Sequence, residues 1–235
     1  MGLNRFFRSL HICAIILSIC KRKVIFMQVI DLNTWPRAIH YHFFRRMDYA
    51  HYLICSNVNV TNFLAKCQEK KIPFYYAMIY AATFALNEVE AFKYRIRQEN
   101  VVLHEKINPS FTAMQQGTDL FKMVTVDMTS GLEEFVEKAK QKTEEQQEYF
   151  VKSDVEGRDD LIYITCIPWV SFTNLSHTIS FNKEDSVPRL AWGKYFRENG
   201  KTLLPFSVEA HHSFVDGIHM GQYFTCLQEY LDDFK

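Results

Sequence analysis

The stretch His211-His212-Ser213-Phe214-Val215-Asp216-Gly217 joins two segments whose hydropathy patterns differ. Residues 202–210, which precede it, form a mostly apolar run that is typical of a buried strand. After Gly217, apolar residues recur at the spacing of one helix face. These residues are Ile218, Phe224, Leu227, Leu231 and Phe234. The sequence therefore predicts a corner between a strand and a helix, with the histidine pair at that corner.

This corner carries the residue types of a proton-transfer site. Histidine titrates close to neutral pH, so a fixed imidazole can take a proton from an alcohol or a thiol. His212 lies four residues before Asp216, whose carboxylate can anchor the local backbone electrostatically. Adjacent side chains on an extended segment point to opposite faces, so we expect one histidine to do the chemistry and His211 to be a packed core residue.

Two other interpretations of the corner carry less weight. A histidine and an aspartate at this spacing also occur as an ordinary pair on a helix surface. A metal site made of His211, His212, Asp216 and His219 is conceivable by residue type, but no separate ligand cluster accompanies it. We therefore expect no metal at this corner.

Composition narrows the class of protein. The chain has 235 residues, of which 48% are hydrophobic and 15% aromatic, which is enough for one large core. Lysine plus arginine equals aspartate plus glutamate at 27 each, so the basic excess that nucleic-acid binding requires is missing. We expect a single enzyme-sized domain that does not bind DNA or RNA.

Cysteine spacing and the missing motifs exclude further classes. The six cysteines are isolated, without a C-x-x-C pair or a zinc-like spacing, so we expect reduced thiols and a cytoplasmic location. They are Cys13, Cys20, Cys55, Cys67, Cys166 and Cys226. Dinucleotide-binding, P-loop, serine-hydrolase and zinc-protease motifs are also missing. Cys166 lies in an apolar strand, where a thiol is usually inert, so we assign it no role.

The first 26 residues form a separate N-terminal extension. Arg5 and Arg8 precede an apolar run from Leu10 to Cys20, and the basic run 21–23 follows it. The apolar run is too short to span a bilayer, and no small-residue cleavage site follows it. We prefer a start assigned too early, with Met27 as the true first residue, over a weak interfacial anchor. The single domain is then 27–235, and we expect no membrane binding.

From Met27 onward the pattern alternates between helices and strands, which indicates an α/β fold. Helices are expected from Pro36 to Arg46, from a Thr61 cap to Lys70, from Pro73 through Leu86, and from Leu132 to Tyr149. The third is apolar all round and should be central, whereas the last is highly charged and should face solvent. Strands are expected at 49–59, 110–115, 120–128 and 161–172, with hairpins at 92–104 and at 189–210 around the turn 198–200.

Several motifs in this order resemble the type A chloramphenicol acetyltransferases, which are related in fold to the acyltransferase cores of 2-oxo-acid dehydrogenase complexes. The motifs are Trp35-x-Arg37, Pro168-Trp169-Val170-Ser171-Phe172, Gly193-Lys194-Tyr195, Leu204-Pro205-x-Ser207-Val208 and the His-His-x-x-x-Asp-Gly run. The resemblance extends from about Met27 to the C-terminus. It implies a two-layer α/β sandwich with a mixed β-sheet and a homotrimer with active sites at the subunit interfaces.

The resemblance also assigns catalytic roles. It makes His212 the general base that deprotonates an acceptor hydroxyl for attack on acetyl-CoA in a ternary complex. Thr165 stands where the family has a serine that donates to the oxyanion, and it keeps a hydroxyl donor. Asp216 is implied to form a buried ion pair with Arg37, which positions the histidine loop. No metal and no permanently bound cofactor are implied.

Further roles concern the two substrates. By resemblance, Lys194 lies near a phosphate of CoA, and Tyr195 and Tyr75 lie along its adenosine end. A second lysine that the family uses toward CoA aligns with Pro73 of this chain. Lys70 or Lys71, which are nearby in the sequence, can take its place. Phe43, Phe44 and Tyr52 are implied to form the acceptor wall, although such an aromatic cluster is by default core packing.

The acceptor pocket departs from the family at four positions. Phe44 stands where the family has a tyrosine that hydrogen-bonds the drug, and Tyr52 where it has a phenylalanine. Ala191 replaces a threonine, and Glu209 replaces a glutamine. The first hypothesis is therefore O-acetylation of chloramphenicol, an antibiotic-resistance activity. The alternatives are the same chemistry on another small alcohol or amine, and a non-catalytic trimeric ligand-binding protein.

Overall fold

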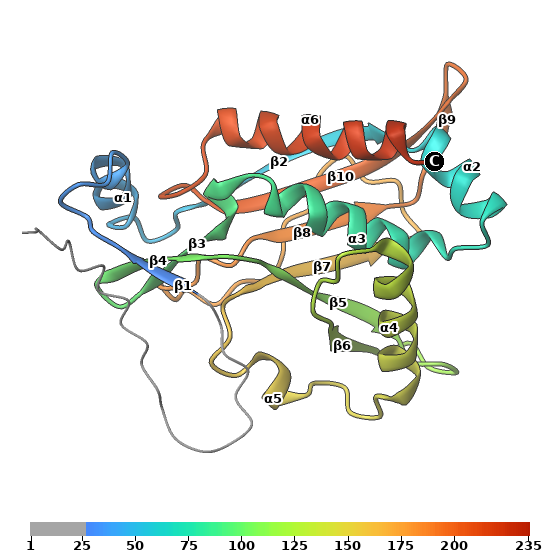
Figure 1. The fold of residues 1–235 in the computed structure, drawn as a ribbon, viewed down its shortest axis with the longest axis horizontal. Helices are drawn as coiled ribbons and strands as arrows, with labels where there is room; N and C mark the ends of the chain where they lie inside the picture. The colour runs from blue at the N-terminus through green and yellow to red at the C-terminus, as the bar shows by residue number, and fades with distance from the viewer. Residues whose placement is uncertain (1–26) are drawn as a thin grey trace, which may run out of the picture.

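The computed structural model describes residues 27–235, and its main feature is a mixed seven-stranded β-sheet with helices packed on one face (Figure 1). The strand order is β2-β10-β8-β7-β5-β6, and β9 pairs with β10. Strands β5, β7 and β8 run parallel, whereas the other pairs are antiparallel. The bounds are β2 His51–Asn59, β5 Asn108–Met114, β6 Phe121–Thr125, β7 Leu161–Ile167, β8 Arg189–Gly193, β9 Phe196–Glu198 and β10 Lys201–His211. The expected α/β class with a mixed sheet is confirmed.

A second, three-stranded antiparallel sheet has the order β1-β4-β3. Its strands are β1 Met27–Ile30, β3 Tyr94–Arg97 and β4 Asn100–His104, so the expected hairpin at 92–104 is present. The helices are α1 Ala38–Phe44, α2 Thr61–Glu69, α3 Phe74–Asn87, α4 Leu132–Glu145, α5 Lys152–Val155 and α6 Gly217–Asp233, with a 3-10 turn η1 at Glu90–Lys93. In the described part of the chain, no helix has the length and apolar character needed to cross a membrane.

The two faces of the large sheet differ in polarity because side chains alternate along each strand. On β10, Phe206 and Val208 face the helices, and the Phe206 ring lies 6.3 Å from Tyr223 of α6. The intervening residues Ser207 and Glu209 are fully buried on the opposite face. The sheet therefore gives one face to the apolar core and keeps polar groups on the other.

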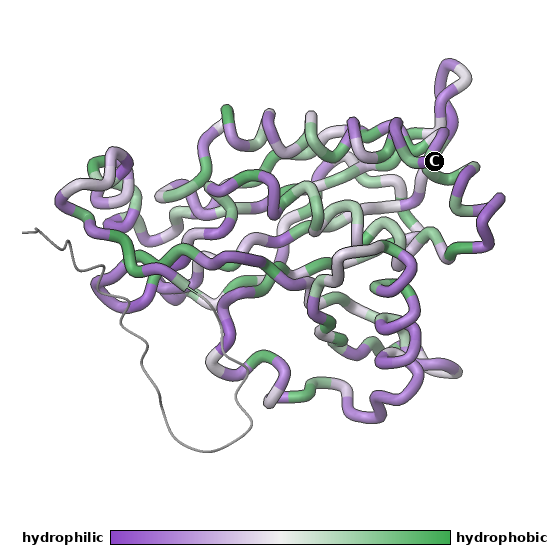
Figure 2. Tube along the Cα trace, viewed as in Figure 1, coloured by the Kyte–Doolittle hydropathy of each residue, from purple (hydrophilic) through white to green (hydrophobic). Residues whose placement is uncertain are grey.

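Helix α3 lies at the centre of the helical layer. Its Phe84 ring is 5.1 Å from Tyr230 of α6, and its Tyr80 ring is 5.5 Å from Phe135 of α4. Figure 2 shows hydrophobic and intermediate residues along α3 but hydrophilic residues along the outer side of α4. The predicted central helix and the predicted solvated helix are both confirmed.

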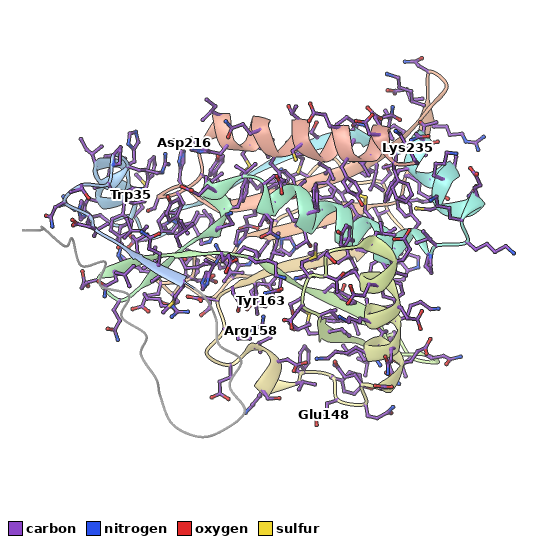
Figure 3. All side chains as sticks on the ribbon, viewed as in Figure 1. Trp35, Glu148, Arg158, Tyr163, Asp216 and Lys235 are labelled. Carbon is purple, nitrogen blue, oxygen red and sulfur yellow. The ribbon has the colours of Figure 1, made fainter. Side chains whose placement is uncertain are left out.

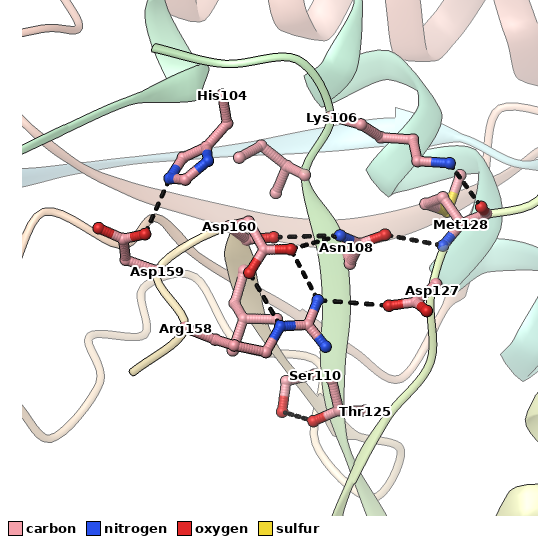
Figure 4. A network of polar contacts seen from close by, with 12 residues as sticks. His104, Lys106, Asn108, Ser110, Thr125, Asp127, Met128, Arg158, Asp159 and Asp160 are labelled. Carbon is pink, nitrogen blue, oxygen red and sulfur yellow. Dashed lines mark hydrogen bonds and ion pairs between the residues drawn. The ribbon is translucent and has the colours of Figure 1, made fainter. Parts of the chain in front are cut away.

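A buried polar network ties the start of β7 to β5 and β6 (Figure 4). The Arg158 guanidinium donates to Asp160 at 2.9 and 2.7 Å, and Asn108 donates to the same carboxylate at 2.8 Å. The Asn108 side-chain oxygen then accepts the backbone N–H of Met128 at 2.9 Å. Because Asp160 and Asn108 both find partners on neighbouring strands, this network fixes the ends of β5 and β7.

Some boundaries differ from those predicted. The expected strand 161–172 ends at Ile167, because the chain turns at Pro168 and the Val170 N–H donates to Ile167. Helix α4 ends at Glu145 rather than Tyr149, and the short α5 was not predicted. Ile218 was expected on the buried face of α6 but is 68% exposed. Leu227 and Leu231 are buried on that face as predicted, together with Met220 and Tyr223, which were not predicted.

The start of α2 also differs from the prediction. Thr61 is the first helical residue rather than a side-chain cap. Its hydroxyl donates to the Asn59 side chain at 2.6 Å and accepts the Thr202 N–H at 2.8 Å. Thr61 therefore joins α2 to the sheet. The interpretations of residues 1–26 concern residues outside those described.

Candidate active site

His212 directly follows β10, and its backbone N–H donates to the Ala50 carbonyl at 2.8 Å. The Phe44 ring stacks on the imidazole at 4.0 Å and 7°, and the Tyr52 ring stacks at 4.4 Å and 30°. Two rings cannot share one face of an imidazole at these distances, so they hold it from both sides. The imidazole plane is therefore fixed by residues from α1 and β2.

The two nitrogens of His212 have different surroundings. Nδ1 is inaccessible and lies 3.1 Å from Oδ1 of Asp216, close enough for attraction but misaligned for a hydrogen bond. The His212 side chain is nevertheless 33% exposed. Since Nδ1 is covered, the exposed edge carries Nε2. This nitrogen is the one that a substrate can reach.

Arg37, at the N-cap of α1, holds the turn 212–216. Its guanidinium binds both carboxylate oxygens of Asp216, at 2.6 and 2.8 Å, so the predicted ion pair is present. The same group donates to the carbonyls of Ser213 at 2.8 Å and His212 at 3.1 Å. Hydrogen bonds from Arg37 lower the pKa of Asp216, so this carboxylate stays ionised. Figure 3 labels Trp35 and Asp216 at the same end of the molecule, where α6 begins.

The side chain of His211 points away from this site, as expected for the residue next to His212 on an extended segment. It is buried, its Nδ1 accepts the Ser213 N–H at 3.2 Å, and its ring lies 5.0 Å from His51. Burial, reinforced by His51, lowers the pKa of His211 to about 3. A neutral, enclosed imidazole of this kind has a structural role. Nδ1 of His219 is also occupied, because it accepts the Asp216 N–H at 2.9 Å.

Glu209 is the centre of a second polar cluster on the face away from the helices. Its fully buried carboxylate accepts the Tyr49 hydroxyl at 2.8 Å and the backbone N–H of His177 at 3.1 Å. Burial opposes ionisation, but these contacts with His177 and Tyr49 lower the pKa of Glu209 to about 2. The cluster ties the segment 168–188 to β10. Sequence reasoning did not predict the contacts of Tyr49 and His177 with Glu209, since neither residue lies in a motif.

Thr165 lies far from His212 within one subunit. It pairs with Ala191 of β8, which pairs with Ser207 of β10, so these residues form one row across the sheet. His212 is five residues beyond Ser207 along the chain and two strands away from Thr165. Strand geometry then separates the Cα atoms of Thr165 and His212 by roughly 19 Å. No side chain spans this gap, so one subunit does not bring the two residues together.

A cavity of about 400 Å³ lies at the ends of the parallel strands β5, β7 and β8, beside α3. Tyr75, Lys194 and Tyr195 all line it, and the latter two are exposed. The Tyr75 hydroxyl donates to the Thr112 carbonyl, so its ring, not its hydroxyl, is free to contact a ligand. The structure thus brings together the three residues predicted to bind CoA.

Gly193 lines this cavity at a point where the turn after β7 comes very close to β8. A Cβ at this position would lie 2.4 Å from the Val170 carbonyl oxygen, which is closer than any side chain tolerates. The same carbonyl accepts the Lys194 N–H at 2.8 Å. Gly193 therefore allows the turn after β7 to press against β8. Two of the sequence motifs meet at this contact.

The aromatic residues expected at the acceptor wall lie around His212. Phe44 and Tyr52 contact the imidazole, whereas Phe43 contacts Phe44 at 5.1 Å and is 61% exposed. Burial, together with Asp216, raises the pKa of Tyr52 to about 12. Its hydroxyl is inaccessible and has no hydrogen-bond partner among residues 27–235. Ala191 is fully buried in the row with Thr165.

Comparison with known proteins gives consistent results. A curated chloramphenicol acetyltransferase from Klebsiella sp is 24% identical over 218 residues, which covers 92% of this chain and 98% of the relative. Chloramphenicol acetyltransferase 2 from Escherichia coli is 27% identical over 206 residues, covering 87% and 96%.

Solved structures agree in fold. One described as a chloramphenicol acetyltransferase superposes with a TM-score of 0.82 at 22% identity, covering 88% of this chain and all of that one. A probable dihydrolipoamide acetyltransferase from Listeria monocytogenes gives a TM-score of 0.62 at 13% identity, covering 83% and 89%. The family model described as chloramphenicol acetyltransferase matches residues 25–228. This chain therefore belongs to the chloramphenicol acetyltransferase family.

Proposed function

We propose that this protein transfers an acetyl group from acetyl-CoA to a hydroxyl group of chloramphenicol. The observation that carries the proposal is the state of His212, whose ring is fixed between Phe44 and Tyr52 while Nε2 remains accessible. A fixed imidazole with one open nitrogen is the arrangement that general-base catalysis requires. The names of the curated relatives supply the substrate class. Such a reaction confers chloramphenicol resistance.

In the proposed reaction, Nε2 of His212 takes the proton of the acceptor hydroxyl as the oxygen attacks the thioester carbonyl. The carbon–oxygen bond forms and gives a tetrahedral oxyanion, which the Thr165 hydroxyl stabilises by donating a hydrogen bond. Collapse breaks the carbon–sulfur bond, and the thiolate of CoA leaves with the proton from His212. Both substrates are present at once, so no acyl-enzyme forms.

The remaining residues of the reaction hold groups in place. Arg37 and Asp216 fix the turn that carries His212. Lys194, Tyr195 and Tyr75 line the cavity of about 400 Å³ that we assign to CoA. Because Thr165 and His212 are roughly 19 Å apart in one chain, we propose that each site combines His212 of one subunit with Thr165 of a second. A homotrimer, as the resemblance implies, provides such sites, and the expected location is cytoplasmic.

A second candidate keeps the chemistry but changes the acceptor. Phe44 offers no hydroxyl, whereas Tyr52 places a buried hydroxyl beside the imidazole that has no partner among residues 27–235. That hydroxyl is inaccessible in the described subunit, so neither Phe44 nor Tyr52 offers a hydroxyl group to the acceptor. This observation favours a small alcohol or amine that needs no hydrogen bond from these two positions, such as a chloramphenicol analogue.

An acceptor panel separates these candidates. Thiol release from acetyl-CoA is measured with chloramphenicol, a simple aliphatic alcohol and an aromatic amine, and each product is identified by mass spectrometry. The proposal predicts the highest kcat/KM for chloramphenicol and a product heavier by one acetyl group. A higher kcat/KM for another acceptor selects the second candidate. Binding of chloramphenicol without turnover of any acceptor would instead identify a non-catalytic binding protein.

A further inference from the structure

A second cavity, of about 710 Å³, is lined in part by Arg37 and His219. It is bounded by the segment that precedes α1, by the turn between α3 and η1, and by one face of α6. Its lining includes Trp35, Glu88, Glu90, Tyr94, Phe214 and Cys226. Apart from Arg37, no residue of the proposed acetyl transfer lines this cavity.

Aromatic rings form one wall of the cavity. The Trp35 ring lies 5.0 Å from Tyr94 and 6.2 Å from Phe214, and Tyr94 lies 5.7 Å from Phe214. Tyr94 and Phe214 are buried, whereas Trp35 is only half-buried. The face of an indole ring carries partial negative charge and attracts cations.

Two exposed carboxylates, Glu88 and Glu90, also line the cavity, and Glu90 accepts the hydroxyl of Tyr94 from the aromatic wall at 2.5 Å. The positive charge of Arg37 is matched by Asp216. Burial and the neighbouring Arg37 lower the pKa of His219, so this residue adds no positive charge at neutral pH.

Cys226 also lines the cavity. Burial, followed by the charges of Glu88 and Glu229, raises the pKa of the Cys226 thiol. The cavity therefore combines an aromatic face with an uncompensated negative charge. Anions are disfavoured by that charge. A bare metal ion is disfavoured as well, because no group of three metal-ligating side chains occurs among residues 27–235.

We propose that this cavity is a binding site for a small organic ammonium ion with an apolar or aromatic body. The ammonium group lies between Glu88 and Glu90 and over the Trp35 ring, and the apolar body contacts the aromatic wall. The site is distinct from the CoA cavity and from the Nε2 edge of His212. It does not depend on the acetyltransferase activity.

Benzyltrimethylammonium is the probe for this site because its charge is permanent. Binding to the full-length protein is measured by isothermal titration calorimetry and by the shift in melting temperature. We expect saturable binding of this cation, and no binding of benzyl alcohol or phenylacetate at the same concentrations. The double variant Glu88→Gln/Glu90→Gln should weaken binding about tenfold or more, since it removes both charges but keeps the shape.

The matched control is Glu137→Gln/Glu144→Gln, which removes two exposed carboxylates from α4, and it should bind the probe like the wild type. Saturating chloramphenicol and acetyl-CoA should leave the probe affinity unchanged. Equal affinity in the Glu88/Glu90 variant, displacement by chloramphenicol or acetyl-CoA, or equal binding of benzyl alcohol would each overturn the proposal. Near-ultraviolet circular dichroism of each variant checks that the fold is retained.

Discussion

At the scale of the residue, the turn after β10 separates two adjacent histidines into different environments. His212 is stacked between Phe44 and Tyr52 with one exposed edge, whereas His211 is enclosed and lies beside His51. Strand alternation predicts that the two side chains face different sides, and the family resemblance is what proposes His212 as the base. The ring contacts of His212 were not predictable from spacing, since they come from α1 and β2.

His211 makes the stability of the protein depend on pH. Its pKa falls from 6.5 to about 3 on folding, so between these values the unfolded chain binds a proton that the folded chain excludes. Stability is therefore complete above pH 6.5 and falls as the pH drops, by roughly 3–5 kcal/mol in total. Urea unfolding at pH 7 and pH 5 measures the loss. His211→Asn, which keeps an acceptor for the Ser213 N–H, should show a smaller loss; the same loss in both proteins would exclude His211 as the cause.

The proposed role of Thr165 as a hydrogen-bond donor to the oxyanion is tested by removing its hydroxyl group. Thr165→Val keeps the shape of the side chain but removes the donor, so kcat should fall roughly 10²–10³-fold with little change in the acceptor KM, as for an interaction made only in the transition state. Thr165→Ser should retain most of the activity. Steady-state kinetics of both variants provide the measurement. Undiminished turnover by the valine variant would mean that the oxyanion is stabilised elsewhere.

At the scale of the element, Arg37 connects α1, the turn after β10 and the start of α6. One guanidinium reaches the Asp216 carboxylate and the carbonyls of His212 and Ser213. The motif positions of Arg37 and Asp216 indicated this pairing, although they are far apart in the sequence. The two carbonyl contacts needed the structure, because backbone acceptors have no sequence signature.

Replacing Arg37 with lysine tests this connection. Lysine keeps the charge but cannot bind two carboxylate oxygens and two carbonyls together, so Arg37→Lys should destabilise the protein by about 2–4 kcal/mol. Lys138→Met breaks an exposed pair with Glu134 on α4 and should change stability by less than about 0.5 kcal/mol. Guanidinium unfolding of both variants measures the difference. Equal stabilities would show that Arg37 does not hold the turn.

The boundaries that differed from prediction have local physical causes. Pro168 interrupts a run that is apolar up to Phe172, so periodicity alone extends the strand too far. Ile218 is apolar but lies two residues before Met220, roughly 200° around the helix axis, so it faces solvent while Met220 and Tyr223 contact the core. Element type was predictable from sequence in these regions, whereas the exact ends depended on tertiary contacts.

At the scale of the whole molecule, the proposed catalytic residues lie in two separate regions of one chain. His212 is at the end of β10, and Thr165 is in the middle of β7, roughly 19 Å away by strand geometry. The sequence motifs indicate both residues but contain no information about this separation. It is the structural reason to expect sites shared between subunits.

Mixing two inactive variants tests whether each active site is shared between two subunits. His212→Ala and Thr165→Val subunits are unfolded together in equal amounts and refolded. If each site takes His212 from one subunit and Thr165 from the next, random assembly gives about a quarter of the sites both functional residues. We therefore expect about a quarter of wild-type thiol release, which far exceeds either variant alone. Activity no higher than the variants' average would place both residues in one subunit.

The central claim is that His212 drives acetyl transfer from acetyl-CoA to chloramphenicol. The most direct measurement is the steady-state release of free thiol from acetyl-CoA with chloramphenicol as acceptor, by the wild type and by His212→Ala. We predict acceptor-dependent release by the wild type and a fall of about 10²–10⁴-fold in the folded variant, which is typical of a lost general base. Wild-type release that does not depend on chloramphenicol, or equal rates in the two proteins, would contradict the account.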